Sequence, residues 1–143
     1  MKRKKILFVC TGNTCRSPMA EILLRAEIKK RKIKFIDVAS AGLKVSKQAV
    51  ISPFSKETLE ENGYTVPAKF KPRQLTDKIF NGAYVVITMT KEQKALMAAH
   101  EKVFCMSELS GEDISDPYGQ GKAAYEKTFT SLQTAVKKIA DDL

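Results

Sequence analysis

A short apolar run followed by a polar loop and a long helical pattern constrains the fold of this chain more than any other feature. Residues 6–9, Ile-Leu-Phe-Val, form a continuous apolar run rich in branched side chains, which indicates a strand buried on both faces. After the loop, Ser17 is predicted to cap a helix, with Pro18 in its first turn and the acidic Glu21 soon after. Its apolar face would be formed by Ile22, Leu23, Ala26 and Ile28. This order is typical of an α/β fold.

Strand and helix patterns alternate along the rest of the chain. Strands are expected at 34–39, 83–89 and 103–106, and helices at 52–62, 91–100 and 122–143, with Ser40-Ala41-Gly42 ending the second strand and loops at 64–73 and 107–121. The alternation predicts a parallel sheet with right-handed crossovers and helices on both faces. Such sheets carry their sites at the carboxyl ends of the strands, so Cys10, Ser40, Met89 and the loop of Asp116 should lie along one edge.

Length, cysteines and charge narrow the class of protein. The 143 residues fit one domain covering 1–143. The apolar run at 6–9 is too short for a signal peptide or membrane span, and the three cysteines do not suggest a secreted disulfide framework, so a cytoplasmic protein is expected. A net charge of +9 would help to recruit phosphorylated or acidic proteins. No nucleic-acid-reading module is apparent, and no nucleic-acid partner is expected.

The loop after the first strand is a candidate phosphate cradle. Its residues are Cys10, Thr11, Gly12, Asn13, Thr14, Cys15, Arg16 and Ser17. Their backbone N–H groups can converge on an anion beside the positive end of the helix dipole. The loop lacks the glycine patterns of nucleotide-binding loops and instead begins with a cysteine, followed six residues later by an arginine. A cysteine and an arginine in place of these glycine patterns favour nucleophilic attack on the phosphate over binding alone.

The loop residues predict a division of chemical roles. The N–H donors, the helix dipole and Arg16 should favour the thiolate form of Cys10, which could then attack phosphorus in line. The planar fork of Arg16 matches two equatorial phosphoryl oxygens and would stabilise the transition state. Ser17 would hydrogen-bond the thiolate and ease its departure when water attacks the phosphocysteine intermediate.

Residues 9–21, VCTGNTCRSPMAE, resemble the signature of the low-molecular-weight protein tyrosine phosphatase family, C-x5-R-[ST]. The similarity continues in Ser40-Ala41-Gly42, in the strand at 83–89 and in Asp116-Pro117-Tyr118, and so covers nearly the whole chain. It implies a single-domain, three-layer α/β sandwich around a four-stranded parallel sheet in the flavodoxin-like order 2-1-3-4.

The resemblance also implies roles for residues outside the loop. Asp116 would be the general acid that protonates the leaving atom and later accepts a proton from the attacking water. Asn13 and Ser40 would brace the loop, with Asn13 in a left-handed conformation. Many family members place a histidine in this network, but Phe70 stands at that position here. Cys15 is either a small loop residue or, as the resemblance favours, the redox partner of Cys10.

Thr11 and Tyr118 are the candidate walls of the substrate pocket. Threonine after the nucleophile resembles the protein-arginine phosphatases of the family, whereas tyrosine-specific members commonly carry Ile or Leu. Tyr118 could stack on a phenyl ring or on a guanidinium. Phosphoarginine is therefore the expected substrate, phosphotyrosine is the alternative, and inorganic phosphate is the product.

Other functions remain as alternatives. An arsenate reductase would need relay cysteines, but Cys105 stands alone on an expected strand. A non-catalytic phosphate-binding redox sensor would be favoured only if Arg16 or Asp116 were absent. His100 is the sole histidine and is expected to be a helix-end residue. No cluster has metal-ligand spacing, so a metal-independent enzyme without cofactor, acting as a monomer, is expected.

Overall fold

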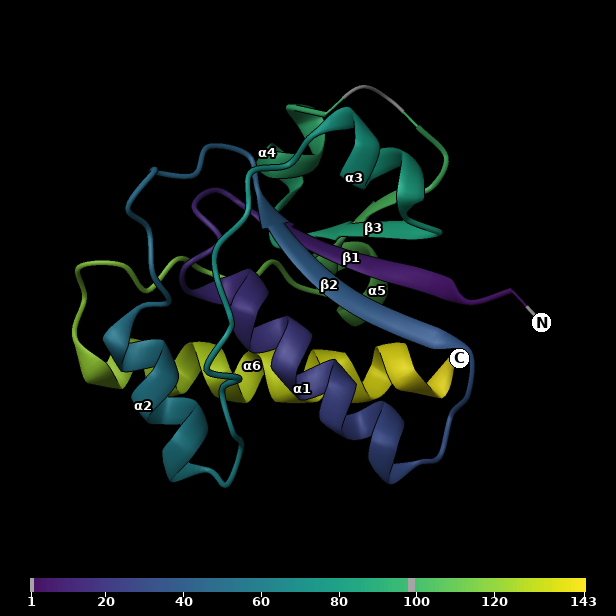
Figure 1. Cartoon of the computed structure of the whole chain (residues 1–143). Coiled ribbons are helices and arrows are strands. Elements are labelled where there is room, and N and C mark those ends of the chain that lie inside the picture. Colours follow the sequence, from purple (N-terminus) through teal and green to yellow (C-terminus); the bar gives the residue numbers. More distant parts are fainter. Residues whose placement is uncertain (1, 98–99) are drawn as a thin grey trace.

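A four-stranded parallel sheet forms the centre of the molecule (Figure 1). The structure, a computed structural model, describes residues 2–97 and 100–143. The strands are β1 (Lys4–Cys10), β2 (Ile36–Gly42), β3 (Val85–Thr88) and β4 (Val103–Cys105). They pair in the order β2-β1-β3-β4, and every pair is parallel. The predicted sheet and its 2-1-3-4 order are confirmed.

Helices cover both faces of the sheet and complete three layers (Figure 1). On one face lie α1 (Arg16–Lys30) and α6 (Lys122–Asp141), with α2 (Pro53–Glu61) and α5 (Met106–Ser110) packed against α6. On the other face lie α3 (Asp77–Gly82) and α4 (Lys91–Ala95). The predicted three-layer α/β sandwich is therefore confirmed. No helix within the described residues is both long enough and apolar enough to cross a membrane.

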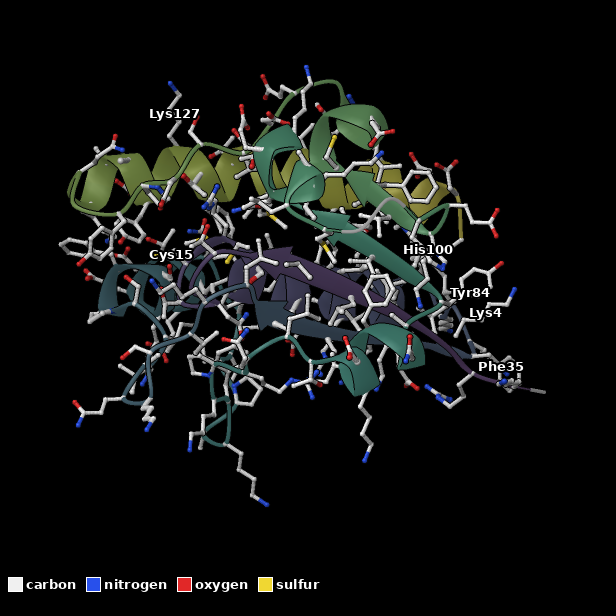
Figure 2. The ribbon with its side chains drawn as sticks, turned by 90° about the horizontal axis from the view of Figure 1, so that it is seen from above. Lys4, Cys15, Phe35, Tyr84, His100 and Lys127 are labelled. Carbon is white, nitrogen blue, oxygen red and sulfur yellow. The ribbon has the colours of Figure 1, made fainter. Side chains whose placement is uncertain are left out.

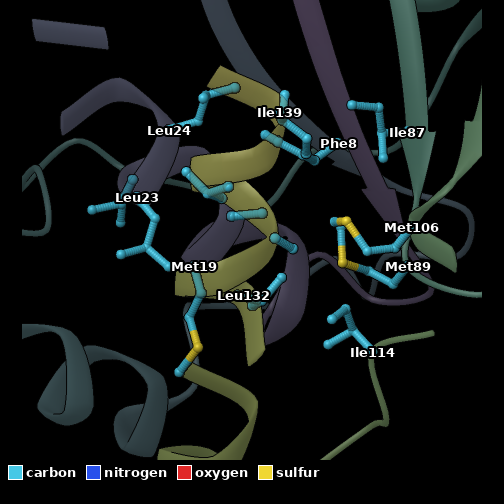
Figure 3. Packing of buried hydrophobic residues seen from close by; sticks show 14 of the residues in the cluster. Phe8, Met19, Leu23, Leu24, Ile87, Met89, Met106, Ile114, Leu132 and Ile139 are labelled. Carbon is cyan, nitrogen blue, oxygen red and sulfur yellow. The ribbon is translucent and has the colours of Figure 1, made fainter. Parts of the chain in front are cut away.

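The apolar run of β1 is buried on both of its faces. Phe8 points toward the core beneath α1 and α6, and Leu7 and Val9 point into the smaller core on the opposite face. Figure 3 shows Phe8 beside Ile139 of α6. Because both faces are covered, the strand shows a continuous apolar run instead of alternation.

The structure corrects two predicted boundaries beside the loop. The expectation that Ser40-Ala41-Gly42 ends the second strand is wrong, because β2 continues through Gly42 and pairs with Cys10 of β1. The expectation that Ser17 caps the first helix is also wrong. Helix α1 begins at Arg16, and its capping residue Cys15 makes no side-chain cap hydrogen bond. The Ser17 hydroxyl instead contacts Asn13 and Cys10 inside the loop.

Two short helices were not predicted. Helix α3 begins after Thr76, whose side chain accepts a hydrogen bond from the Ile79 backbone N–H. Helix α5 begins at Met106, the predicted end of the fourth strand, and continues into the segment 107–121 that was predicted to be a loop. Helices of five or six residues are too short to show an amphipathic period. Helix α4 ends at Ala95, earlier than predicted, and residues 98 and 99 of the predicted helix lie outside the described residues.

Candidate active site

Backbone N–H groups of neighbouring segments hold three carbonyl groups of the loop from Cys10 to Ser17 by hydrogen bonds. The carbonyl oxygens of Cys10 and Thr11 accept hydrogen bonds from the backbone N–H groups of residues 43 and 44, both at 2.9 Å, and that of Thr14 accepts one from residue 52 at 2.8 Å. Among the described residues, the backbone N–H groups of residues 11–15 donate to no protein acceptor. Free N–H groups beside the start of α1 can bind an anion.

Gly42 allows β2 to approach this loop closely. A Cβ atom at this position would lie 2.8 Å from the Thr11 carbonyl oxygen and 3.0 Å from the Asn13 backbone nitrogen. Both neighbours are backbone atoms of the loop, so any side chain here would push the loop out of place. The glycine was noted in the sequence only as a strand end, and the close approach that requires it is visible only in the fold.

Cys10 and Ser17 face each other at the base of the loop. Both side chains are buried, and the Cys10 Sγ lies 2.9 Å from the Ser17 Oγ. The Ser17 oxygen accepts a hydrogen bond of 2.7 Å from the Asn13 Nδ2. Because this oxygen is already an acceptor, the Ser17 hydroxyl proton is free to be donated to the sulfur. Such a bond stabilises a thiolate.

Asn13 is the centre of the hydrogen-bond network that holds the loop. It is fully buried, and its φ of 55° is left-handed, as expected for a position that favours asparagine. Its Oδ1 accepts a hydrogen bond from the Arg73 backbone N–H at 2.9 Å, which fixes the orientation of the amide. Its Nδ2 then donates to Ser17 and, at 3.0 Å, to the Ser40 Oγ.

The network continues from Ser40 to a buried carboxylate that the sequence reasoning missed. The Ser40 hydroxyl donates to the Glu21 Oε1 at 2.6 Å, and Arg25 pairs with the Glu21 Oε2 at 3.0 Å. In the sequence, Glu21 is recognisable only as an acidic residue near the helix start. An acidic residue within an otherwise apolar stretch of α1 is the signal that could have identified it, since buried carboxylates are nearly always paired.

Phe70 does not join this network, and Arg73 contributes in its neighbourhood instead. Besides its backbone bond to Asn13, Arg73 donates from its Nε to the Ser40 carbonyl oxygen at 3.2 Å. Phe70, Arg73 and Glu21 also line an open cavity of about 670 Å³ beside β2, which contains none of the loop residues from Cys10 to Ser17. This cavity is therefore separate from the candidate site.

Arg16 and Asp116 come together although they lie far apart in the sequence. The Arg16 Nη2 lies 3.6 Å from the Asp116 Oδ2, and the Arg16 Nη1 donates to the Ile114 carbonyl oxygen at 3.0 Å. The Arg16 side chain is 6% exposed and that of Asp116 is 54% exposed. Arg16 is thus buried and held by Ile114, while the Asp116 carboxyl group beside it is half-exposed.

Thr11 and Tyr118, the predicted pocket residues, have very different surroundings. Tyr118 is 76% exposed, and its backbone N–H donates to the Asp116 Oδ1 at 3.1 Å. The Thr11 Oγ1 accepts a hydrogen bond of 3.2 Å from the Gln93 Nε2. Gln93 follows β3 in α4, and the sequence reasoning did not single it out.

Cys15 is a buried residue of the loop and contacts a tyrosine of α6. Its Sγ lies 3.4 Å from the Tyr125 Oη. Burial, together with this contact, raises the pKa of Tyr125 to about 12. Cys10, Cys15 and Cys105 are all free thiols.

The remaining candidates from the sequence lie elsewhere. Figure 2 shows His100 on the side of Lys4 and Tyr84, at the amino ends of the strands, and well away from Cys15. Its ring packs edge-on against Phe80. Cys105 is buried at the end of β4, the strand on which it was expected.

These contacts assemble the chemical groups that phosphoryl transfer needs. The Cys10 thiol and its hydroxyl partner Ser17 lie in a loop with free backbone N–H groups, the Arg16 guanidinium is buried, and the half-exposed Asp116 carboxyl group lies 3.6 Å from that guanidinium. Attack on phosphorus, stabilisation of the equatorial oxygens and protonation of the leaving atom can each be performed by a different one of these groups.

The family model and the relatives that are similar to this chain agree on one family. Residues 5–143 match the model of the family described as low molecular weight phosphotyrosine protein phosphatase. A protein-arginine-phosphatase of Bacillus subtilis is 34% identical, with 96% of this chain and 95% of the relative covered. The low molecular weight protein-tyrosine-phosphatase PtpB of Staphylococcus epidermidis is 33% identical, with 94% and 96% covered.

Solved structures agree with this result. A crystal structure of a mutant of YwlE from Bacillus subtilis superposes with a TM-score of 0.90 at 31% identity, covering 97% of both chains. The low molecular weight protein tyrosine phosphatase from T. tengcongensis superposes equally well at 32% identity, covering 98% of this chain and 99% of the other. With the family model, the relatives and the fold in agreement, this chain belongs to the low molecular weight phosphotyrosine protein phosphatase family.

Proposed function

We propose that this chain is a cysteine-dependent protein phosphatase that removes phosphate from phosphorylated side chains, with phosphoarginine as the preferred substrate. The observation that carries the proposal is the short contact between the Cys10 Sγ and the Ser17 Oγ inside a cradle that also contains Arg16. A structural cysteine would not need a hydroxyl donor, a buried guanidinium and free backbone N–H groups around it.

The first step forms a phosphocysteine. The substrate phosphoryl group binds the N–H groups of Thr11 to Ser17 and the fork of Arg16. The Cys10 thiolate attacks phosphorus, the bond from phosphorus to the substrate nitrogen or oxygen breaks, and Asp116 gives its proton to that leaving atom. Asp116 is thereby left as a carboxylate.

The second step releases inorganic phosphate. The Asp116 carboxylate accepts a proton from a water molecule as the water oxygen attacks phosphorus. The sulfur–phosphorus bond breaks, and Cys10 leaves as a thiolate. This thiolate accepts a hydrogen bond from the Ser17 hydroxyl. Asn13 and Ser40 keep Ser17 in this orientation through the network described above. Atoms and charge balance without a metal ion or cofactor.

Thr11 supports phosphoarginine over phosphotyrosine. A threonine narrows the floor of the pocket and adds a polar group where a flat phenyl ring would favour apolar contact. The relatives alone do not decide between the two substrates, because those similar to this chain include proteins named as arginine phosphatases and as tyrosine phosphatases. Phosphotyrosine is the second candidate, and the exposed Tyr118 ring could stack on either substrate.

The experiment compares kcat/KM for a phosphoarginine peptide and a matched phosphotyrosine peptide. Wild type, Thr11→Ile and Cys10→Ser are the three proteins to measure. A phosphoarginine preference that Thr11→Ile reverses supports the proposal, and Cys10→Ser should be inactive on both peptides. A phosphotyrosine preference of the wild type would refute the substrate assignment, and activity on neither would favour an arsenate reductase or a phosphate-binding sensor.

We further propose that Cys15 protects the nucleophile from irreversible oxidation. A peroxide would oxidise the Cys10 thiolate to a sulfenic acid, and the Cys15 thiolate would then form a disulfide with Cys10 and release hydroxide, which takes up the thiol proton as water. Mass spectrometry after peroxide treatment should show the disulfide in wild type. In Cys15→Ser it should show sulfinic acid at Cys10. If Cys15→Ser regained its activity after addition of a reductant as fully as wild type does, this role would be contradicted.

The setting of this activity is the cytoplasm, where reduced thiols persist and phosphorylated proteins are the partners. The three free cysteines and the net charge of +9 support this setting. The enzyme would act as a monomer and without nucleic-acid partners.

A further inference from the structure

Gln93 is a buried polar side chain whose amide has one fixed orientation. It lies in the first turn of α4 and is only 4% exposed. Its Oε1 accepts hydrogen bonds from the backbone N–H groups of Met89 at 3.0 Å and Thr90 at 3.2 Å. Because the amide oxygen faces these two donors, the amide nitrogen must face the other way.

The Gln93 amide nitrogen faces the loop of the candidate site. Its Nε2 donates to the Thr11 Oγ1 at 3.2 Å. An amide N–H cannot accept, so the Thr11 hydroxyl must act as the acceptor in this contact. One of its lone pairs is used, while the other lone pair and the hydroxyl proton remain available. The Thr11 carbonyl is also held, by the Lys44 N–H at 2.9 Å, so the residue is fixed at both ends.

An acceptor held at this position distinguishes between two classes of substrate. In phosphoarginine the nitrogen bonded to phosphorus carries a hydrogen, whereas in phosphotyrosine the corresponding atom is an ether-like oxygen without one. A lone pair on the residue next to the nucleophile can therefore accept a hydrogen bond from the first substrate only, and the bridging oxygen of the second substrate is a weak acceptor for the hydroxyl proton. Sites built to hydrogen-bond an N–H discriminate more strongly than purely apolar pockets do.

We infer that Gln93 is a positioning residue for substrate selection, which holds the Thr11 hydroxyl so that its free lone pair accepts the N–H of a phosphorus–nitrogen substrate. The inference rests on the proposed phosphatase function and assigns a residue that sets its substrate class. Gln93 itself does not touch the reacting atoms. It acts from α4 across the end of β3, and this connects helix α4 to the floor of the pocket.

The test measures the ratio of kcat/KM for phosphoarginine and phosphotyrosine peptides. Gln93→Met keeps the length of the side chain but removes its donor, and it should lower the ratio about three- to tenfold, the effect of one hydrogen bond. The change should fall on phosphoarginine, while kcat/KM for phosphotyrosine stays within about twofold. In a Thr11→Val background, Gln93→Met should leave the ratio unchanged, because the group that it positions is gone.

Two control variants separate positioning from damage to α4. Thr90→Val removes the hydroxyl that accepts a hydrogen bond from the Gln93 backbone N–H but leaves the Gln93 side chain in contact with Thr11. It should destabilise α4 without changing the ratio. Gln93→Glu offers one oxygen to the two backbone N–H groups and a second oxygen to the Thr11 hydroxyl. The added negative charge should lower kcat/KM for both peptides. The ratio of the two kcat/KM values should stay within about twofold.

A binding measurement keeps this inference separate from the proposed function. Calorimetry on Cys10→Ala, with and without Gln93→Met, gives the ratio of Kd values for phosphoarginine and phosphotyrosine without any reaction, because alanine carries no nucleophile. A ratio that shifts about three- to tenfold toward phosphotyrosine in the double variant supports the inference. An unchanged ratio, or an equal shift with Thr90→Val, overturns it. Failure of the wild type to hydrolyse either peptide would refute the proposed function instead.

Discussion

Replacing Asn13 tests whether the hydrogen-bond network holds the loop in its active shape. Three hydrogen bonds of 2.7, 2.9 and 3.0 Å would be lost in Asn13→Ala. At about 1 kcal/mol for each buried hydrogen bond, their loss costs about 3 kcal/mol. Alanine at a φ of 55° adds about 1 kcal/mol of backbone strain. The expected loss of unfolding free energy is therefore about 4 kcal/mol, a large part of the stability of a small domain.

Asn13→Gly separates the two contributions. Glycine adopts a φ of 55° without strain, but its unfolded chain gains conformational entropy, so Asn13→Gly should be more stable than Asn13→Ala by at most about 0.5 kcal/mol. Both variants should also lose turnover of a small aryl phosphate, because Ser17 no longer has a donor that directs its proton toward Cys10.

Urea unfolding followed by far-ultraviolet circular dichroism is the assay, since the chain has no tryptophan to report by fluorescence. The free energies are compared at matched slopes of the transition. A loss below about 1 kcal/mol in Asn13→Ala would show that the three bonds are readily replaced by water, and the reasoning about the buried network would be refuted.

Three further outcomes are expected. Asp116→Asn should slow turnover of aryl phosphates about 10²–10⁴-fold, and a full rate in steady-state kinetics would rule out Asp116 as the general acid. Orthovanadate should inhibit competitively and should still bind Cys10→Ser in calorimetry, whereas insensitivity would count against the cradle. The pKa of Tyr125 is raised from 10.0 to about 12 by burial and its contact with Cys15, so the folded state binds a proton that the unfolded chain has lost. Stability should therefore fall between pH 10 and pH 12, and urea titrations should show a shallower fall in Tyr125→Phe; equal slopes would contradict the assignment.

Much of the fold could be predicted because its signals are local. The apolar run of β1 and the helical spacing of Tyr125 and Phe129 in α6 record burial directly in the sequence. The short helices α3 and α5 could not be predicted in this way, since five or six residues do not complete two helical turns. Ser17 was placed at the wrong boundary because a serine before a proline is a typical cap, and only the folded loop gives its hydroxyl other partners.

The candidate site likewise has features that local sequence predicts and features that depend on the fold. The sequence by itself determined the cradle, because Cys10, Arg16 and the helix start lie within seven residues and the backbone alone brings them together. The tertiary structure decided everything that reaches the cradle from elsewhere. Glu21 acquires its partner through Ser40 on β2, Arg73 reaches Asn13 from a loop, and Gln93 reaches Thr11 from α4. These contacts join residues separated by up to 82 positions, and their geometry exists only when parallel strands bring their carboxyl ends to one edge of the sheet.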